Sequence, residues 1–401
     1  MQTAPLVLKE NHLQIVTDQQ GDIPPGNDNG FGLYYFDTRY LSAFEVLING
    51  QPPLYLSHAA ERDYIATFQY VNPPYPLPDG MVAPRQSISI RRSRFVDGRA
   101  FRERVGLYNC NHFPVDIDLT LRFEADFRDM LAIRGFCRQR LAARTTSRFG
   151  PEGLEFSYVG RDNVARHTLI RFSEQPEPIS SNIMLFHLRL EPHQPASISL
   201  SVRPSTGRRK PVKAVGFDNA LDRLIRSYKQ WHLDSTALTT DNDFFDQSLL
   251  RQSQYDIRAL IESEERDPNG KTGHQPDIVP AAGLPWYAVP FGRDSIITAL
   301  QTIAYNPEIA LGTLRFLARH QGDEENPVTE EQPGKILHEL RRGELANLRE
   351  IPHLPYYGTV DATSLFVILF VEAMAWVGSA ELYRELLPHA LRAIEWADRY
   401  G

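Results

Sequence analysis

Hydrophobic and polar positions alternate with a period of two along much of the first two hundred residues. Val115–Phe123 and Ser197–Val202 show the alternation most clearly. A period of two places successive side chains on opposite faces of a strand, so these runs predict half-buried β-strands. Further strands of this kind are predicted at Leu41–Gly50, Gln86–Arg91, His167–Phe172 and Met184–Leu190.

Two dipeptides between such runs, Asn49-Gly50 and Asp97-Gly98, are typical of hairpin turns, because these residues tolerate the left-handed backbone that tight turns require. No long helical pattern interrupts this stretch. Residues 1–212 are therefore expected to form an antiparallel β-sandwich. The polar, proline-containing segment Ser201–Pro211 is the expected connector to a second domain.

From about residue 213 the apolar positions recur at spacings of three and four, which predicts helices. The first is expected within Asn219–His232. A second is expected over Asn242–Ile261, with Asp241 as its N-cap and Phe244 and Phe245 at the start of its apolar stripe. Four more are predicted at Ser295–Ala304, Pro307–His320, Ala362–Val377 and Ala380–Arg399. Residues 213–401 are thus predicted to form an all-α domain.

Long loops separate these helices, above all Asp267–Gly292 and Gln321–Gly358, which are rich in Gly, Pro, His and aromatic residues. Loops of this length in a compact domain usually carry function. The recurrence of helix, loop and helix fits stacked helical hairpins, but solenoid repeats share the same spacing, so periodicity alone leaves both open.

Composition narrows the class of protein. The 401 residues are 42% hydrophobic and 23% charged, which is typical of a globular protein. The net charge is −7 and the basic residues are spread out, which does not favour binding to nucleic acid. Arginine-rich stretches such as Arg91–Arg94 are interpreted as solvated strand faces. A neutral ligand such as a sugar fits this charge better than a phosphate-rich one.

Cysteine content and hydropathy point to a reduced compartment. Cys110 and Cys137 are the two cysteines, which excludes a disulfide framework and a cysteine-rich metal site. Met1–Gln20 contains no signal-peptide pattern. The longest apolar stretch, Leu365–Val377, is too short to cross a bilayer and predicts a buried helix. We expect a soluble, cytoplasmic protein without a membrane partner; its oligomeric state is not predicted.

A first group of candidate site residues lies in Pro285–Ser295. Trp286 and Tyr287 offer aromatic faces that stack on sugar rings, and Arg293 and Asp294 offer charge-assisted hydrogen bonds to hydroxyl groups. The alternative is structural, in which Asp294 caps the following helix and Arg293 forms a local ion pair. The residues alone leave these two interpretations balanced.

A second segment, Pro333–Arg342, contains His338 and Glu339. These side chains form either a polar wall of a binding site or an exposed amphipathic turn, and the second is favoured without further context. The H-E-x-x-H zinc motif would need another histidine one turn later, and it is absent here. We predict no metal ion and no other cofactor.

A third segment, His353–Thr363, contains Tyr356 and Tyr357 on a loop flanked by Pro and Gly, which makes them candidates for substrate contact. Asp361 is a further candidate, although it also suits the N-terminus of the apolar helix that follows. All three segments precede helices. A binding site at one end of a helical barrel would show this arrangement.

Taken together, these motifs make the chain resemble the bacterial amylo-alpha-1,6-glucosidases, or glycogen-debranching-enzyme-like proteins. The resemblance rests on Asp28–Ser42, which ends in Asp-Thr-Arg-Tyr-Leu-Ser, and on Pro285–Thr298, Pro333–Leu345 and Pro355–Leu365. It implies an N-terminal β-sandwich followed by an (α/α)6 toroid of the six-hairpin glycosidase type. It also implies an oligo- or polysaccharide substrate of the α-glucan class.

The resemblance carries over residue by residue. Glucoamylases, related by fold, have a similar Arg-Asp-Ser before an inner helix, which implies that Arg293 and Asp294 bind the terminal glucose of an exo-acting enzyme. Asp294 is also a candidate catalytic carboxylate, but hydroxyl binding is favoured. The family's Trp-Lys-Asp-Ser-like segment is absent. We therefore expect an incomplete toroid, with the general acid and base of an inverting hydrolysis beyond Gly401 and a fragment that is inactive alone.

Two other functions remain open from the sequence. A six-hairpin hydrolase of another sugar, similar to trehalase or to mannosylglycerate hydrolase, would have the same helical pattern. A non-catalytic glycan-binding protein would also place aromatic and polar residues on such loops. The glycosidase acting on α-glucan is the leading hypothesis.

Overall fold

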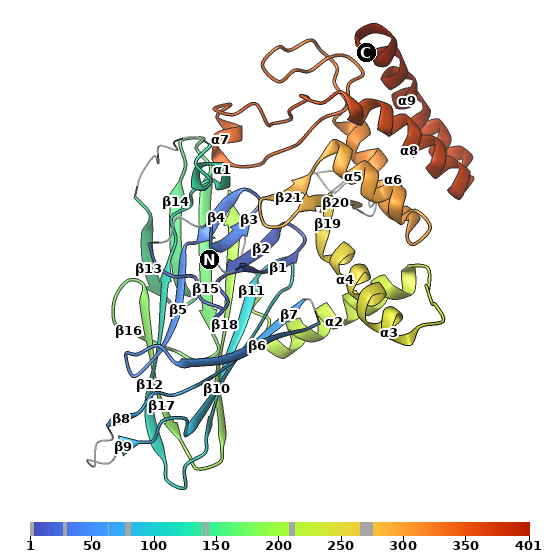
Figure 1. The fold of residues 1–401 in the computed structure, drawn as a ribbon. Helices are drawn as coiled ribbons and strands as arrows, with labels where there is room; N and C mark the ends of the chain where they lie inside the picture. Colours follow the sequence, from blue (N-terminus) through green and yellow to red (C-terminus); the bar gives the residue numbers. More distant parts are fainter. Residues whose placement is uncertain are drawn as a thin grey trace. The chain divides into compact units, whose positions relative to one another are not determined.

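The computed structural model describes residues 4–26, 30–62, 64–76, 82–136, 138, 141, 144–207, 213–264 and 276–401. They form two compact units, Met1–Leu224 and Ile225–Gly401, called here the β-unit and the helical unit (Figure 1). Three predicted segments, Asp28–Ser42, Ser201–Pro211 and Asp267–Gly292, lie partly outside the described residues, which leave out 27–29, 208–212 and 265–275. Cys137 also lies outside them. The domain boundary between residues 212 and 213 stays a prediction.

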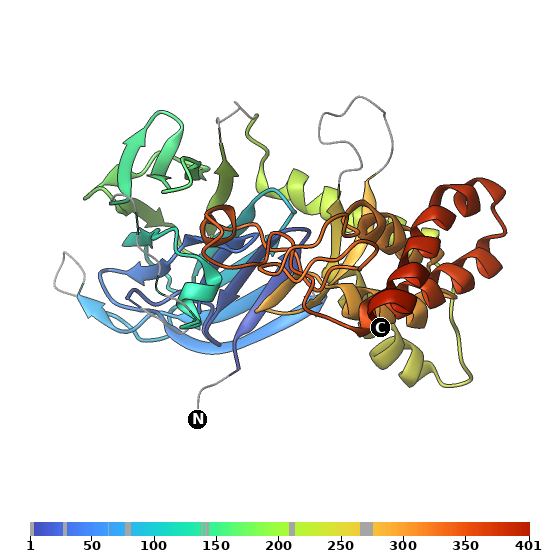
Figure 2. The ribbon, with the colours of Figure 1, turned by 90° about the horizontal axis from the view of Figure 1, so that it is seen from above.

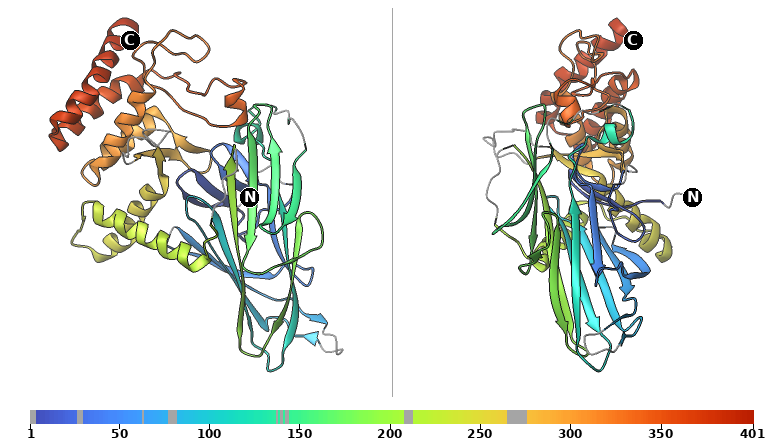
Figure 3. Two further views of the ribbon diagram at one scale, coloured as in Figure 1. Left: turned by 180° about the vertical axis from the view of Figure 1, so that it is seen from behind. Right: turned by 90° about the vertical axis from the view of Figure 1, so that its left-hand side faces the viewer.

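The larger layer of the β-unit is an eight-stranded antiparallel sheet. In spatial order its strands are β13 (Thr146–Gly150), β14 (Gly153–Val159), β15 (Ala165–Phe172), β18 (Pro195–Thr206), β11 (Phe101–Asn109), β10 (Ile88–Val96), β7 (Ile65–Val71) and β6 (Leu54–Arg62). The second layer contains four antiparallel strands, in the order β16 (Glu177–Pro178), β17 (Ile183–Leu190), β12 (Val115–Glu124) and β5 (Ala43–Ile48). Figure 3 shows long strands of the β-unit from two sides.

Smaller elements complete the β-unit. A four-stranded antiparallel sheet contains β1 (Leu6–Glu10), β2 (Leu13–Thr17), β3 (Gly32–Tyr35) and β4 (Thr38–Leu41), and a two-stranded sheet contains β8 (Tyr75–Pro76) and β9 (Val82–Ala83). The single turn of helix α1 (Met130–Ile133) follows its N-cap Asp129.

The core of the β-unit follows from the alternation along its strands. On β12, every second side chain from Val115 to Phe123 is buried, as the period of two predicts. Phe123 stacks on Phe44 of β5 with ring centroids 5.1 Å apart, and Phe44 meets Phe101 of β11 edge-on at 6.2 Å. Side chains of both layers thus interdigitate, which confirms the predicted β-sandwich.

The hairpin turn predicted at Asp97-Gly98 is confirmed, because it joins the paired strands β10 and β11. Asn49-Gly50 forms a tight turn, but the strands on either side of it, β5 and β6, belong to different sheets, so it is not the turn of a hairpin. Asn49 and Gly50 have φ angles of 49° and 75°, and Ile48 and Gln51 exchange both backbone hydrogen bonds across them. At the second turn, the Asp97 carboxylate accepts hydrogen bonds from the backbone N–H groups of Arg99 and Ala100, at 3.1 and 2.9 Å. The positive φ angles explain the glycine and asparagine at these positions.

The Arg91–Arg94 stretch is exposed at Arg91 but buried at Arg92 and Arg94. Arg92 and Arg94 are fully buried and flank the buried Glu103, with Arg92 Nε 2.5 Å and Arg94 Nη2 2.7 Å from its carboxylate oxygens. The Arg94 guanidinium also lies over the Phe68 ring, 4.7 Å from its centroid. For Arg92 and Arg94 the predicted exposure was wrong, because the carboxylate that pairs with them and the ring under Arg94 come from other strands.

The helical unit contains helices joined by long loops. Its elements are the C-terminal part of α2 (Phe217–Asp234), α3 (Asp243–Phe245), the π-helical turn η1 (Asp246–Leu250), α4 (Arg251–Leu260), α5 (Gly292–Thr302), α6 (Pro307–Arg319), α7 (Glu344–Asn347), α8 (Asp361–Val377) and α9 (Ala380–Tyr400). Helices α5, α6, α8 and α9 pack together around one apolar cluster (Figure 2). None of the described helices is long and apolar enough to cross a membrane.

The helix predicted over Asn242–Ile261 is present, but it differs from the prediction at its start, its end and one internal turn. Its backbone stays helical from Asp243 to Leu260 through α3, η1 and α4, with a π-helical turn at η1, and its N-cap is Asn242 instead of Asp241. Phe244, from its predicted apolar stripe, is 77% exposed. The last residue of the predicted helix, Ile261, already belongs to a strand. That strand is part of an unpredicted antiparallel sheet of β19 (Ile261–Glu264), β20 (Asp277–Gly283) and β21 (Tyr287–Pro290).

Candidate functional site

The structure brings the three candidate segments together through their backbones. The Gly292 N–H donates to the His338 carbonyl oxygen at 2.9 Å, and the His338 N–H donates to the Tyr356 carbonyl oxygen at 2.7 Å. Tyr356 N–H in turn donates to the Glu339 carbonyl oxygen at 3.0 Å. Segments up to 64 positions apart in the chain (292 to 356) therefore lie next to one another ahead of α5 and α8.

Gly292 permits this close approach. A Cβ atom at this position would lie 2.1 Å from the Leu337 carbonyl oxygen and 3.1 Å from the Ala362 Cβ atom. Contacts as short as the first do not occur between real atoms, so only glycine allows the N-terminus of α5 to lie against the Leu337 backbone.

Arg293 and Asp361 form an ion pair between the first turns of α5 and α8. Arg293 Nη1 donates to Asp361 Oδ2 at 3.1 Å, and the Thr359 hydroxyl donates to Asp361 Oδ1 at 2.5 Å. Partial burial disfavours the charged carboxylate, but these two bonds outweigh it and hold the Asp361 pKa below its usual range. The Asp294 carboxylate lies 3.9 Å from Arg293 Nε.

This polar group remains accessible. The side chain of Arg293 is 47% exposed, and those of Asp294 and Asp361 are each 38% exposed. The ion pair with Asp361 raises the Arg293 pKa, so the guanidinium stays charged. A fixed, charged and partly exposed donor between two carboxylates can hydrogen-bond several neighbouring hydroxyl groups of one ligand.

Glu339 has a different environment, because its side chain is buried. Its Oε1 lies 2.9 Å from His353 Nε2, and its Oε2 accepts a hydrogen bond from Arg341 Nε at 3.0 Å. Burial alone would raise the Glu339 pKa, but the His353 hydrogen bond and the Arg341 charge outweigh it and lower the pKa. Glu339 is thus a fixed anion, and it does not lie on the exposed turn that the sequence favoured.

Arg341 links this anion to the aromatic candidate Trp286. Both of its terminal nitrogens lie 3.4 Å from the Trp286 carbonyl oxygen, and its guanidinium lies over the Phe291 ring at 5.8 Å. Arg341 and His353 are not among the site residues predicted from the sequence. The sequence does place several cations near Glu339 in the same loop. Only the folded loop determines which of them contacts its carboxylate.

Aromatic rings surround these charged groups. His338 meets Phe291 edge-on at 5.4 Å and Tyr356 at 6.0 Å, and Tyr287 meets Phe291 at 5.9 Å. The Tyr356 hydroxyl donates to Glu330 Oε1 at 2.8 Å, and this bond raises the Tyr356 pKa. Edge-to-face contacts fix the ring orientations, which leaves a rigid aromatic surface.

The tyrosine candidates differ in exposure. Tyr287 is 46% exposed, whereas Tyr357 is 3% exposed and donates its hydroxyl hydrogen bond to the His320 carbonyl oxygen. Tyr357 packs within the apolar cluster of the helical unit. We therefore do not include Tyr357 among the proposed ligand-contacting residues.

Comparison with solved structures shows the class of fold. A protein assigned as a kojibiose phosphorylase from the human microbiome matches with a TM-score of 0.60 at 11% identity, covering 97% of this chain and 56% of its own. A bacterial glucoamylase solved with acarbose matches with a TM-score of 0.52 at 12% identity, covering 98% and 57%. The chain thus spans less than two thirds of either structure's length.

These matches confirm the predicted fold class, an N-terminal antiparallel β-sandwich followed by helices of an (α/α)6 toroid, as in six-hairpin glycosidases. In the β-unit, residues 8–201 match the family model of the N-terminal domain of some glycogen debranching enzymes. No curated protein sequence matches the chain.

Proposed function

We propose that the protein is a glycoside hydrolase acting on α-glucan, of the exo-acting and inverting debranching type. Arg293, Asp294 and Asp361 bind the hydroxyl groups of the terminal glucose. The observation that carries this proposal is the exposed Arg293–Asp361 ion pair between the first turns of two helices. The family match of the β-unit and the glucoside-processing neighbours support an α-glucan as substrate.

The chemistry of the pair suits a neutral polyhydroxyl ligand. A carboxylate accepts and a guanidinium donates, so adjacent hydroxyl groups that both donate and accept can bridge the two. Charge-assisted hydrogen bonds of this kind are roughly twice as strong as neutral ones. Tyr287 and Tyr356 add aromatic faces close by, on which the apolar face of a pyranose ring stacks.

Inverting hydrolysis needs a general acid and a general base about 6.5–9.5 Å apart. A general acid must carry a proton at the working pH, and the lowered Glu339 pKa is opposed to that role. We propose instead that Glu339, through Arg341, positions Trp286 and the loop that carries it. Asp294 stays a candidate catalytic carboxylate within the chain.

Binding of defined oligosaccharides tests the site. Calorimetric titration of the chain with maltotriose and isomaltotriose should give measurable affinity, which Arg293→Gln and Asp361→Asn weaken by about tenfold or more. The matched control is Glu385→Gln, which removes a comparable carboxylate from the Arg315 ion pair on the same unit. Equal affinity in Asp361→Asn and in the control would show that the proposed subsite is wrong.

Product analysis tests the reaction itself. Protein expressed from the whole open reading frame should release glucose from α-1,6 or α-1,4 linked oligosaccharides, and proton NMR should show the β-anomer first. Binding without release would instead favour a glycan-binding protein. Turnover of trehalose or mannosylglycerate in preference to glucans would favour a hydrolase of another sugar.

A further inference from the structure

Three adjoining cavities lie in the β-unit, beside β15, β18 and the segment 213–217. Their volumes are about 380, about 200 and about 50 Å³, and Arg171 and Ala214 line all three. The smallest cavity has an unusual charge. Its wall contains one carboxylate, Asp97, against six cations: Arg99, Arg102, Arg171, Arg203, Lys213 and Arg223.

Strand register places several of these cations on one face of the sheet. Ser201 of β18 pairs with Arg102 of β11 on one side and with Arg171 of β15 on the other. Because side chains alternate along a strand, Arg203 lies on the same face two positions further along β18. Like charges on neighbouring positions of one face repel, so the fold holds these groups together at a cost.

The single carboxylate of this wall is already engaged. Asp97 Oδ2 accepts a hydrogen bond from Arg102 Nε at 2.7 Å and lies 4.0 Å from Arg223. Its other oxygen accepts the backbone hydrogen bonds of the turn. Arg171 pairs with Glu152, 3.2 Å away, outside this cavity wall.

Three cations of this wall, Arg99, Arg203 and Lys213, form no ion pair with a residue that the structure describes, and Arg203 is the one that is partly buried. Its guanidinium makes no hydrogen bond or ion pair with any residue that the structure describes. Partial burial lowers its pKa, and the charges of Arg99 and Arg171 lower it further. A partly desolvated arginine that faces other cations is the environment in which a bound anion would be most strongly stabilised.

We propose that this cationic cavity binds a phosphate group, either of free orthophosphate or of a sugar phosphate, with Arg203, Arg99 and Lys213 as its ligands. Arginine matches the geometry of phosphate oxygens through paired N–H donors, and lysine adds a point charge. The site is independent of the carbohydrate site proposed in the helical unit. Binding would relieve the repulsion between the cations that line the cavity.

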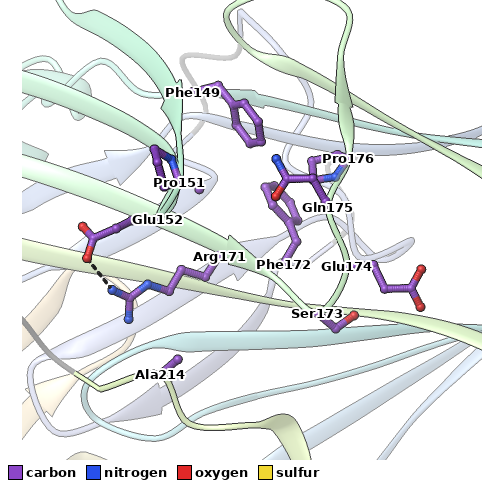
Figure 4. Close-up of a pocket in the computed structure, with 11 residues that line it drawn as sticks. Phe149, Pro151, Glu152, Arg171, Phe172, Ser173, Glu174, Gln175, Pro176 and Ala214 are labelled. Atoms are coloured by element: carbon purple, nitrogen blue, oxygen red, sulfur yellow. Dashed lines mark hydrogen bonds and ion pairs between the residues drawn. The ribbon is translucent and has the colours of Figure 1, made fainter.

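The largest cavity gives a reason to include sugar phosphates. Its wall combines the half-buried rings of Phe149 and Phe172 with the polar side chains of Ser173 and Gln175 (Figure 4). Apolar faces beside hydrogen-bonding groups are what a sugar ring requires. Arg171 borders this cavity and the cationic one, so a phosphate and an attached sugar could occupy both.

Titration calorimetry and thermal unfolding in a phosphate-free buffer of constant ionic strength test the proposal. Orthophosphate or glucose 6-phosphate should bind the wild-type chain and raise its melting temperature. Arg203→Gln should weaken that affinity by about tenfold or more, consistent with loss of a charge-assisted hydrogen bond. The control Arg85→Gln removes the same charge from an exposed arginine outside these cavities and should leave the affinity unchanged.

The comparison of ligands separates the two sources. Tighter binding of glucose 6-phosphate than of orthophosphate indicates a sugar phosphate, and the reverse order indicates the free ion. If Arg203→Gln fails to fold, Lys213→Gln, at an exposed position, takes its place. Absence of binding to the wild type, or equal affinities in the wild type and the variants, would overturn the proposal.

Discussion

Arg293 Nη1 donates a hydrogen bond to Asp361 Oδ2 at 3.1 Å, although the two residues lie 68 positions apart in the chain. Each residue stands in the first turn of its helix. The two side chains are 47% and 38% exposed, so the pair contributes little to stability and can be reached by a ligand. Its position therefore favours binding over stabilisation as its role.

This distinction leads to the first prediction. Asp361→Asn should lower the free energy of unfolding by less than about 1 kcal/mol, because exposed ion pairs contribute little. The same variant should lose most of its affinity for malto-oligosaccharides. Urea unfolding and calorimetry measure the two quantities separately. A large loss of stability with unchanged affinity would assign the pair a purely structural role.

The second prediction concerns Gly292. Gly292→Ala places a methyl group 2.1 Å from the Leu337 carbonyl oxygen, so the backbone must move. We expect a loss of about 2 kcal/mol or more in stability, measured by urea unfolding through the helical circular dichroism signal. Gly283→Ala is the control, because nothing lies within 4 Å of a Cβ atom there. Equal stability of the two variants would contradict the observed close approach.

The third prediction concerns Glu339 and pH. Its pKa is lowered in the folded state from an ordinary value of 4.5, so its contribution to stability is complete above about that pH. The contribution is lost as the pH falls through the folded-state pKa. Glu339→Gln should cost about 3 kcal/mol at pH 7, because it leaves buried Arg341 without its anion.

Urea unfolding of the wild type and of Glu339→Gln at several pH values measures this effect. The difference between the two free energies should narrow as the pH falls below 4.5. A difference that stays constant from pH 7 to pH 3 would mean that the carboxylate charge contributes nothing.

The fourth prediction concerns His187 on β17. Its ring nitrogens lie 2.7 Å from Asp118 and 3.2 Å from Glu177, and these hydrogen bonds raise its pKa above the ordinary value of 6.5. A raised pKa contributes stability that is complete below about pH 6.5 and lost as the pH rises through the folded-state value. The melting temperature of the wild type should therefore fall as the pH rises above about 6.5. The variant His187→Gln should lack this fall.

Melting curves from pH 5.5 to 8.5 test this, with Glu177→Gln as a variant that removes one of the two anions and should reduce the decline only in part. Added salt should weaken the effect, because the side chains of His187, Asp118 and Glu177 are 62%, 52% and 61% exposed. If the wild type and His187→Gln respond to pH in parallel, the ring does not titrate in contact with these carboxylates.

Local sequence determined much of the fold. The alternation along β12, the turns at Asn49 and Asp97, and the helices near Pro307 and Ala380 follow from period, turn chemistry and capping, which act over a few residues. The order of residues also marked the segments that meet at the candidate site. These features depend on neighbours in the chain, and one sequence is enough to find them.

Tertiary structure decided which side chains face one another. Three features depend on residues from other strands or from distant parts of loops. They are the burial of Arg92 beside Glu103, the contact of His353 with Glu339, and the unpaired guanidinium of Arg203. Electrostatic and packing interactions act through space, so their partners are set only when the chain has folded. The same reason explains why Phe244 is 77% exposed although the local pattern places it on an apolar stripe, because only the folded chain determines which stripe another element covers.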